Sequence, residues 1–393
     1  MNIFHRSFRY PSRWLALILA LAMPPWATAR ASCDLERPAP GCDPVSLDRA
    51  MHMNDLQAVG THNSYKQAMP PAELAAHRAR DPRADGIDYG HRPLGEQLDR
   101  GARTLELDVY YDPHGGYYAH PPGALRKGYA RSPWSPTATR QMQQPGFKVM
   151  HMADIDFRSS CQTFVVCLTI IRDWSHAHPR HVPIMLLINA KDGHSGPGAV
   201  TPLRFTEAAF DALDAEIRTV LSPGDLVTPD DVQGSYPTLR EAVRAGHWPT
   251  LGAARGKEFF VLDEDPPKVA LYRGARRSLE GRVMFINTDE ASPAAAYLTL
   301  NDPQGQAARI ARDVAAGYLV RTRADANTVE ARRHDTRRRE AAFASGAQYI
   351  STDYLWPDPR FGDYRVQLPG EAAARCNPLR APACHAAAAG KHP

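Results

Sequence analysis

A histidine followed directly by an asparagine stands where a short, mainly apolar run of the sequence ends. Residues 56–59 read Leu-Gln-Ala-Val, and the polar turn after them contains His62 and Asn63. An imidazole can accept or donate a proton near neutral pH, and an amide oxygen is a hard neutral ligand of the kind that calcium binds. Proton transfer and cation binding are therefore both available at one predicted strand end.

Two carboxylates in a second predicted strand strengthen the case for a cation. Glu106 and Asp108 are separated by one residue, so in a strand both side chains point to the same face. Like charges on one face repel each other unless a cation lies between them. Together with Asn63 they offer oxygen donors for one hard cation, although a surface ion pair or a salt bridge to Arg103 is the alternative explanation.

The elements that must position these side chains alternate between strands and helices. Runs that are apolar on both faces, such as 184–188, are typical of a parallel sheet covered by helices. Strands are expected at 56–59, 104–109, 148–150, 183–188, 258–262, 282–286, 318–320 and 349–351, with helices at 161–176, 206–221, 239–245, 307–316 and 328–344.

Eight such strand–helix units predict an α/β fold, a single-domain (βα)8 TIM barrel with its catalytic groups at the C-terminal strand ends. The long loop at 110–145, with only a weak helix, predicts that the barrel is irregular there. The candidate residues all fall at such strand ends: His62, Glu106, Asp108, His151, Asn189, Asp263, Arg321 and Asp353.

Sequence motifs in a fixed order resemble the active-site blocks of a known family. They are Thr-His-Asn-Ser-Tyr at 61–65, Glu-Leu-Asp at 106–108, Met-His-Met-Ala-Asp at 150–154, Arg-Thr-Arg-Ala-Asp at 321–325 and a longer block at 345–354. The chain resembles phosphoinositide-specific phospholipase C over about 56–378, most closely its secreted bacterial, calcium-dependent branch. The resemblance implies the same barrel, often irregular on one side.

The resemblance also implies a reaction, in which the inositol 2-hydroxyl of phosphatidylinositol attacks phosphorus and diacylglycerol leaves. Inositol 1,2-cyclic phosphate is the product. This displacement needs a base, an acid and positive charge at the phosphate. By resemblance, His151 is the general acid for the leaving group. His62 is assigned to contact with the phosphate and to proton transfer from the attacking hydroxyl. The order of these two roles is left open.

The metal site implied by the resemblance departs from the family at one position. The expected ligands are Asn63, Glu106, Asp108 and Asn189. The family usually has an acidic residue where Asn189 stands, and an amide can coordinate calcium but brings no charge. Calcium is the expected ion and magnesium the alternative.

Further residues are interpreted as contacts to the phosphate or the inositol ring: Lys191, Asp263, Arg321, Asp353 and Tyr354. For Lys191 a solvated loop lysine is an equally good interpretation, and Tyr354 also suits aromatic packing. The acyl chains need an apolar approach surface. Tyr117, Tyr118 and Trp134 in the long loop are candidates, with burial inside the loop as the alternative.

The first 29 residues have the pattern of a cleaved signal peptide. Arginines precede an apolar run shorter than the roughly 20 residues that a bilayer span needs, and Ala-Thr-Ala at 27–29 suits the cleavage rule. We expect a secreted or periplasmic protein without a transmembrane span; an uncleaved anchor is the alternative. The expected organisation is a signal peptide at 1–29, an N-terminal segment with a disulfide at 30–54, a catalytic barrel at 55–378 and a tail at 379–393.

The cysteines fall in close pairs along the chain: Cys33 with Cys42, Cys161 with Cys167 and Cys376 with Cys384. An even number of cysteines behind a signal peptide predicts disulfides formed in an oxidising compartment. Pairing of nearest neighbours is the favoured connectivity, and some buried free thiols are the alternative. No pair has zinc-site spacing with a histidine.

Charge and motifs limit the partners. The formal net charge of +4 falls to about +1 without the arginines of the first 29 residues, so a strong basic field for nucleic acid is absent. A phospholipid at a membrane surface is the expected partner, and the protein is expected to be a monomer. No Gly-x-Ser-x-Gly elbow occurs, which disfavours a serine hydrolase.

Two rival functions remain open. Glycerophosphodiester phosphodiesterases and sphingomyelinase D-like enzymes also combine two histidines with a Glu-x-Asp metal site, but the turn at 62–65 favours phospholipase C. A non-catalytic barrel that binds lipid headgroups is the second alternative, and Asn189 is its only support.

Overall fold

The computed structural model describes residues 33–37, 42–126, 133–194 and 199–380. The predicted signal peptide at 1–29 and nearly all of the predicted tail lie outside these ranges. Within the described ranges, no helix has both the length and the apolar character needed to cross a membrane.

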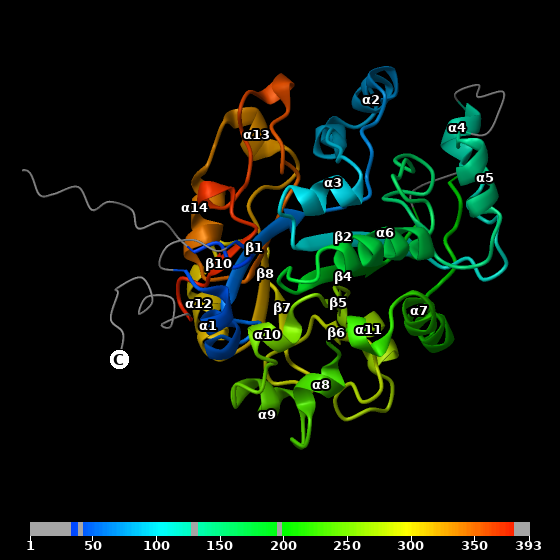
Figure 1. Cartoon of the computed structure of the whole chain (residues 1–393). Coiled ribbons are helices and arrows are strands. Elements are labelled where there is room, and N and C mark those ends of the chain that lie inside the picture. The colour runs from blue at the N-terminus through cyan, green and yellow to red at the C-terminus, as the bar shows by residue number, and fades with distance from the viewer. Residues whose placement is uncertain (1–32, 38–41, 127–132, 195–198, 381–393) are drawn as a thin grey trace, which may run out of the picture. The chain divides into compact units, whose positions relative to one another are not determined.

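Two five-stranded sheets form the centre of the fold, in the orders β10-β1-β9-β8-β7 and β3-β2-β4-β5-β6. Eight of these strands pair in parallel and carry the barrel (Figure 1). Their bounds are Leu56–Thr61 (β1), Thr104–Tyr110 (β2), Ile184–Ala190 (β4), Glu258–Leu262 (β5), Met284–Ile286 (β6), Tyr297–Thr299 (β7), Leu319–Arg323 (β8) and Tyr349–Thr352 (β9). Every residue of β1 and β2 is buried, as expected for strands covered on both faces.

The two sheets meet at two seams, where the strand ladder is interrupted. Between β6 and β7 a single parallel bridge joins Asn287 to Tyr297. Between β1 and β2 the Arg103 amide donates to the Val59 carbonyl at 2.8 Å. A Cβ at Gly60 would lie 1.9 Å from a backbone oxygen of β2, so only glycine permits this approach. The architecture agrees with the predicted distorted (βα)8 barrel.

One predicted barrel strand was wrong. Residues 148–150 do not form a parallel strand; β3 covers only Lys148–Val149 and pairs antiparallel with the end of β2. The eighth parallel strand is instead β7, which sequence reasoning missed because it has three residues and follows three alanines of low strand propensity. A short antiparallel strand, β10 (Ala374–Cys376), was also missed and borders β1.

The helices lie outside the strands (Figure 1). The α-helices are Pro44–Ala50 (α1), Pro71–Arg78 (α2), Leu94–Asp99 (α3), Pro122–Arg126 (α4), Pro136–Met142 (α5), Phe164–Ala177 (α6), Glu207–Val220 (α7), Pro229–Gln233 (α8), Leu239–Arg244 (α9), Leu251–Ala254 (α10), Pro266–Arg273 (α11), Ala307–Ala315 (α12), Val329–Arg333 (α13) and Arg337–Ala344 (α14). Short 3-10 helices cover Pro82–Ile87 (η1), Pro223–Asp225 (η2), Pro359–Phe361 (η3) and Pro369–Glu371 (η4).

Local sequence explains where several helices begin and end. Thr163 and Thr206 cap α6 and α7 by accepting backbone hydrogen bonds from the first turn. The helix predicted at 328–344 is two helices, because His334 adopts the left-handed conformation with φ of 51° and ends α13. The stretch between β2 and β4 is irregular, as the long loop at 110–145 predicted. It contains α4, α5, β3 and α6.

A second, smaller hydrophobic cluster lies under this irregular stretch. It contains Tyr118 and Trp134, which are only 2% and 9% exposed. Of the two interpretations of these rings, burial inside the loop is correct and contact with lipid is not. Tyr117 is the exception, with 44% of its surface exposed.

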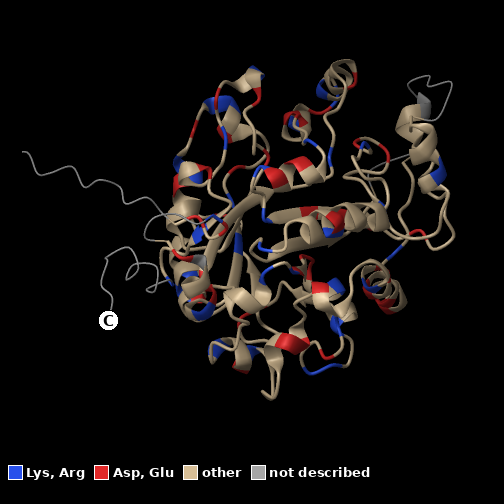
Figure 2. Cartoon of the chain, in the orientation of Figure 1, with Lys and Arg blue, Asp and Glu red and all other residues tan. Residues whose placement is uncertain are grey.

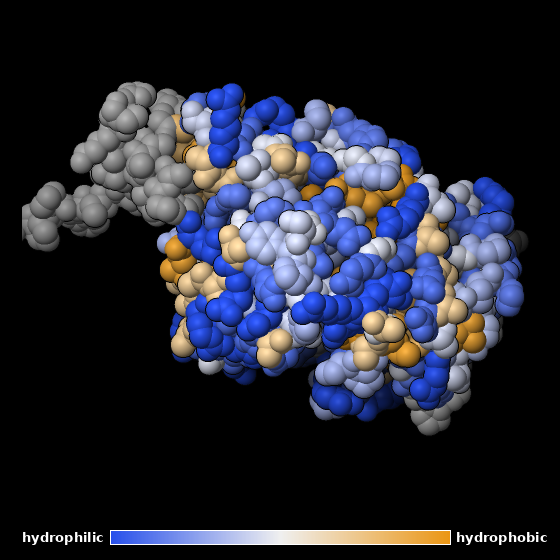
Figure 3. Space-filling model, turned by 90° about the horizontal axis from the view of Figure 1, so that it is seen from below, coloured by the Kyte–Doolittle hydropathy of each residue, from blue (hydrophilic) through white to orange (hydrophobic). Residues whose placement is uncertain are grey.

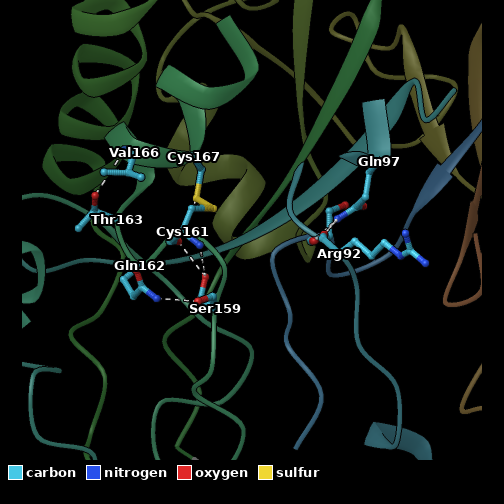
Figure 4. The surroundings of a disulfide bond; sticks show 9 residues. Arg92, Gln97, Ser159, Cys161, Gln162, Thr163, Val166 and Cys167 are labelled. Carbon is cyan, nitrogen blue, oxygen red and sulfur yellow. Dashed lines mark hydrogen bonds between the residues drawn. A yellow bond between two sulfur atoms is a disulfide. The ribbon is translucent and has the colours of Figure 1, made fainter. Parts of the chain in front are cut away.

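Two of the predicted disulfides are present, Cys33–Cys42 and Cys161–Cys167. The third predicted pair includes Cys384, which lies outside the described residues. The Cys161–Cys167 bond closes the turn that leads into α6, beside Ser159 and Thr163 (Figure 4). This turn also forms an antiparallel bridge between Ser159 and Lys66, so the disulfide supports the loop that follows β1.

Candidate active site

The end of β1 places His62 against the end of β9. The two strands are parallel neighbours with Thr61 opposite Thr352, so the residues that follow them are adjacent. His62 Nδ1 lies 2.8 Å from Asp353 Oδ1. The second oxygen of this carboxylate accepts a hydrogen bond from Arg323 at 2.9 Å. Both oxygens of Asp353 therefore face protein partners.

The surroundings of His62 favour the neutral imidazole. Burial and the Arg323 charge lower the pKa of His62 to about 3, although the Asp353 carboxylate opposes this shift. The Tyr89 hydroxyl lies 3.1 Å from His62 Nδ1, and the His91 ring contacts the His62 carbonyl at 2.8 Å. With Nδ1 turned to Asp353, Nε2 is the nitrogen left to exchange a proton, and it lies 3.6 Å from a Glu106 oxygen.

Glu106 and Asp108 share one face of β2, as their spacing predicts, and both are buried, at 5% and 1% exposure. Glu106 accepts hydrogen bonds from Arg321 at 2.6 Å and from Asn189 Nδ2 at 3.2 Å. Burial raises the pKa of Glu106 to about 7. The Arg321 charge opposes this rise in pKa, and the neighbouring Asp108 charge increases it. Asn189 stands directly opposite Asp108 in the parallel register of β2 and β4.

Asn63 is held beside these carboxylates by the turn after β1. It adopts a left-handed conformation with φ of 49°, which asparagine tolerates better than most residues. Ser64 fixes the turn to β2, because its amide donates to the Glu106 carbonyl at 2.9 Å and its hydroxyl accepts from the Glu106 amide at 2.8 Å. The Tyr65 hydroxyl donates to Asn63 Oδ1 at 3.3 Å. Burial and the nearby Asp108 charge raise the pKa of Tyr65.

The predicted metal ligands therefore meet at one rim of the barrel. They supply two carboxylates and two amide groups, a donor set suited to a hard cation. The buried Asp108 carboxylate lies 3.0 Å from the Lys191 ammonium, so a side chain of the protein already supplies positive charge beside one of its oxygens. Nowhere in the described ranges do three His, Cys, Asp or Glu side chains cluster in a metal-binding arrangement, so the amides are needed to complete a site.

His151 belongs to a second histidine–aspartate pair, on the turn that follows β3. His151 Nδ1 lies 3.0 Å from Asp156 Oδ2. The same oxygen lies 3.2 Å from the ammonium of Lys66, and both Lys66 and Asp156 are buried. Burial raises the pKa of Asp156, but Lys66 and His151 outweigh it and hold that pKa below its usual value.

A continuous series of contacts joins the two histidines. The Tyr89 hydroxyl approaches His62, and the Tyr89 carbonyl accepts from the Lys66 ammonium at 2.6 Å. Lys66 in turn pairs with Asp156, which contacts His151. These contacts link the two predicted histidines, and His62 lies beside the predicted metal ligand Glu106.

Comparison with known proteins identifies the family. A family model described as "Phosphoinositide phospholipase C, Ca2+-dependent" matches residues 51–378. The chain belongs to this family. It is therefore a phosphodiesterase of the phosphoinositide phospholipase C type, and the predicted resemblance is confirmed. No curated protein sequence matches the chain.

Solved structures agree on the fold of this phospholipase C family member. A calcium-dependent phosphoinositol-specific phospholipase C from Pseudomonas sp. matches with a TM-score of 0.52 and 18% identity, covering 86% of this chain and 100% of that one. A Ca2+-dependent phosphatidylinositol-specific phospholipase C from Streptomyces antibioticus matches with a TM-score of 0.51 and 20% identity, covering 84% and 99%.

The residues predicted to contact substrate fall into two groups in this family member. Lys191 and Asp263 lie at the rim, where Lys191 Nζ is 3.0 Å from Asp108 Oδ2 and Asp263 accepts from Asn287 at 2.9 Å. The guanidinium of Arg321, the carboxylate of Asp353 and the ring of Tyr354 are engaged by the protein. Tyr354 is buried and packs edge-on against Tyr364 and Phe361.

Sequence reasoning did not find the residues that hold the two histidines in place. Asp156, Lys66, Tyr89 and Arg323 are these residues. Arg323 is separated from the predicted substrate contact Arg321 by one residue, within the motif at 321–325. No sequence pattern pointed to Asp156, which lies two positions after the acidic residue of the motif around His151.

Proposed function

We propose that this protein cleaves the glycerophosphate ester of phosphatidylinositol. The inositol 2-hydroxyl oxygen attacks phosphorus, the bond from phosphorus to the glycerol oxygen breaks, and inositol 1,2-cyclic phosphate and diacylglycerol are formed. The observation that supports this proposal is the pairing of each histidine with a buried aspartate, with His62 Nε2 3.6 Å from the buried Glu106 carboxylate. Family membership supports the same reaction class.

The two histidines divide the proton transfers in this proposal. His62, held through Nδ1 by Asp353, accepts the proton of the attacking hydroxyl at Nε2. His151, held through Nδ1 by Asp156, donates a proton from Nε2 to the leaving glycerol oxygen. Asp353 is then a positioning residue instead of a substrate contact, because its oxygens already face His62 and Arg323.

Calcium is the proposed ion, with magnesium as the alternative. The residues that would hold it are Asn63, Glu106, Asp108 and Asn189. When bound, the ion supplies positive charge against the phosphate oxygens and lowers the pKa of the attacking hydroxyl. Arg321 is proposed to fix Glu106, to which it donates at 2.6 Å. Lys191 and Asp263 remain proposed contacts to the phosphate and the inositol hydroxyls, and Tyr354 is proposed to serve in packing.

The location and the approach to lipid are also proposals. The disulfides fit an oxidising compartment, so we propose secretion or export to the periplasm. Basic and acidic residues are interspersed along the described part of the chain (Figure 2), which gives no support for a nucleic-acid partner. The face seen in Figure 3 is mainly hydrophilic, with hydrophobic residues in small groups. Tyr117 is the remaining candidate for contact with the membrane surface, and the monomeric state stays a prediction.

The test is an assay on phosphatidylinositol vesicles with product identification, with and without a chelator and after calcium or magnesium is restored. Wild type should release inositol 1,2-cyclic phosphate, and the chelator should stop this release. His62→Ala and His151→Ala should each lower the rate by about 10²–10⁴-fold with an unchanged thermal transition. Sphingomyelin and glycerophosphodiesters serve as competing substrates, and preferred turnover of either would replace the proposal.

A further inference from the structure

The proposed calcium site already contains two cations that belong to the protein. Arg321 lies 2.6 Å from Glu106, and Lys191 lies 3.0 Å from Asp108. Each buried carboxylate of the site is thus paired with one positive side chain, so the formal charges of the four groups cancel. A divalent ion that enters this site meets carboxylates that are already neutralised.

The two cations differ in how firmly they are held. Arg321 is 3% exposed and donates to Ser351 at 2.9 Å and to Asn301 at 2.7 Å as well as to Glu106. Lys191 is 33% exposed, and its ammonium pairs with Asp108 alone among the described residues. Arg321 is therefore a fixed part of the site, whereas Lys191 can leave Asp108 by rotation of its flexible side chain.

Asp108 needs a positive partner when no metal ion is bound. It is 1% exposed, and the one cation paired with it among the described residues is the Lys191 ammonium at 3.0 Å. Its neighbour Glu106 lies on the same face of β2, so the two carboxylates repel each other. A buried carboxylate without a counter-charge is strongly destabilising. The Lys191 ammonium supplies that charge at the position beside Asp108 that a metal ion would take.

We propose that Lys191 is a resident counter-ion that occupies the cation position beside Asp108 and is displaced when calcium binds. This inference rests on the calcium site of the proposed function. It explains how the chain folds with a carboxylate pair at its centre before an ion arrives. It also predicts that calcium binds more weakly than to the same oxygen donors without the lysine, because the Lys191–Asp108 contact must first be broken.

The test measures calcium binding directly, without substrate. Calcium chloride is titrated calorimetrically into the chelator-treated protein as wild type, Lys191→Met and Lys191→Arg. Lys191→Met keeps the side-chain length but removes the charge, so its dissociation constant should be on the order of tenfold lower than that of wild type. Lys191→Arg keeps the charge and should bind as wild type does. Lys257→Met, at the opposite end of the strands, is the matched control and should also bind as wild type does.

Thermal unfolding gives a second, independent readout. Without calcium, Lys191→Met should melt at a lower temperature than wild type, and calcium should raise its melting temperature by more than it raises that of wild type. Asp108→Asn should remove the binding heat in both backgrounds. Heat that persists in Asp108→Asn would place the ion elsewhere and overturn the proposal.

The remaining outcomes separate this proposal from the one it rests on. Equal dissociation constants for wild type and Lys191→Met, or weaker binding by Lys191→Met, would overturn the role of Lys191 and leave the calcium site intact. Absence of binding in every folded variant would overturn the calcium part of the proposed function, and the role of Lys191 with it.

Discussion

The two histidines of the site are held by the same arrangement of charged side chains, but different elements of the fold carry the two arrangements. In each case a buried aspartate contacts the imidazole Nδ1 and also pairs with a cation of the protein. The two sets are His62–Asp353–Arg323 and His151–Asp156–Lys66, with imidazole-to-carboxylate distances of 2.8 Å and 3.0 Å. The same combination of imidazole, carboxylate and cation is thus assembled twice in one molecule.

The difference lies in what holds each set in place. His62, Asp353 and Arg323 come from the ends of the neighbouring parallel strands β1, β9 and β8, so strand register fixes their positions. His151 and Asp156 lie on a turn outside the barrel strands, where a fully buried lysine and a disulfide supply the support. We expect the His62 set to withstand perturbation better than the His151 set, and the predictions below test this.

Removal of the Lys66 charge should have the largest effect on the His151 set. Lys66→Met leaves Asp156 buried without its cation, which should lower the free energy of unfolding by about 3–5 kcal/mol in urea unfolding. The matched control is Lys148→Met, because the Lys148 ammonium is equally buried and lies 3.2 Å from Asp112. Both variants should be destabilised, but only Lys66→Met should alter the pH profile of activity. Full stability of Lys66→Met would mean that Asp156 does not depend on this ion pair.

Glu258 is a buried carboxyl with no cation paired to it among the described residues. It shows what the buried aspartates of the two histidine sets would do without their cations. Glu258 is fully buried at the start of β5, and burial raises its pKa from 4.5 to about 8. The folded state therefore keeps a proton that the unfolded chain releases, so stability is lost as pH rises from about 4.5 through about 8. The loss should reach up to about 5 kcal/mol and should vanish in Glu258→Gln, measured by urea unfolding at several pH values. An identical pH dependence in Glu258→Gln would contradict this.

The aspartates should affect the rate more than the stability. Asp353→Asn and Asp156→Asn keep the size of the side chain but remove the charge that orients each imidazole. Each should lower kcat by roughly 10²-fold with KM little changed, because only proton transfer is impaired. If Asp353 instead bound the inositol ring, Asp353→Asn would raise KM and leave kcat nearly unchanged. Steady-state kinetics on phosphatidylinositol vesicles distinguishes the two results.

The surroundings of His62 could be predicted from the sequence better than those of His151, for a physical reason. Alternation along a strand placed Glu106 and Asp108 on one face, and the strand ends placed His62 beside them. The contact between His62 and Asp353 joins residues 291 positions apart, which no local pattern encodes. Asp156 lies on an irregular turn without periodicity, so nothing in the sequence linked it to His151.

Loss of the Cys161–Cys167 bond should weaken the His151 set alone. The bond closes a loop of six residues, and loop-closure entropy gives it about 2 kcal/mol of stabilisation, the smallest of these effects. The double substitution Cys161→Ala with Cys167→Ala should lower the free energy of unfolding by that amount. Hydrogen exchange should increase in the turn that carries His151, because the neighbouring segment pairs with Lys66 through Ser159. Exchange at the end of β1 should stay slow, since strand pairing holds His62; equal acceleration at both histidines would show that the two sets share one support.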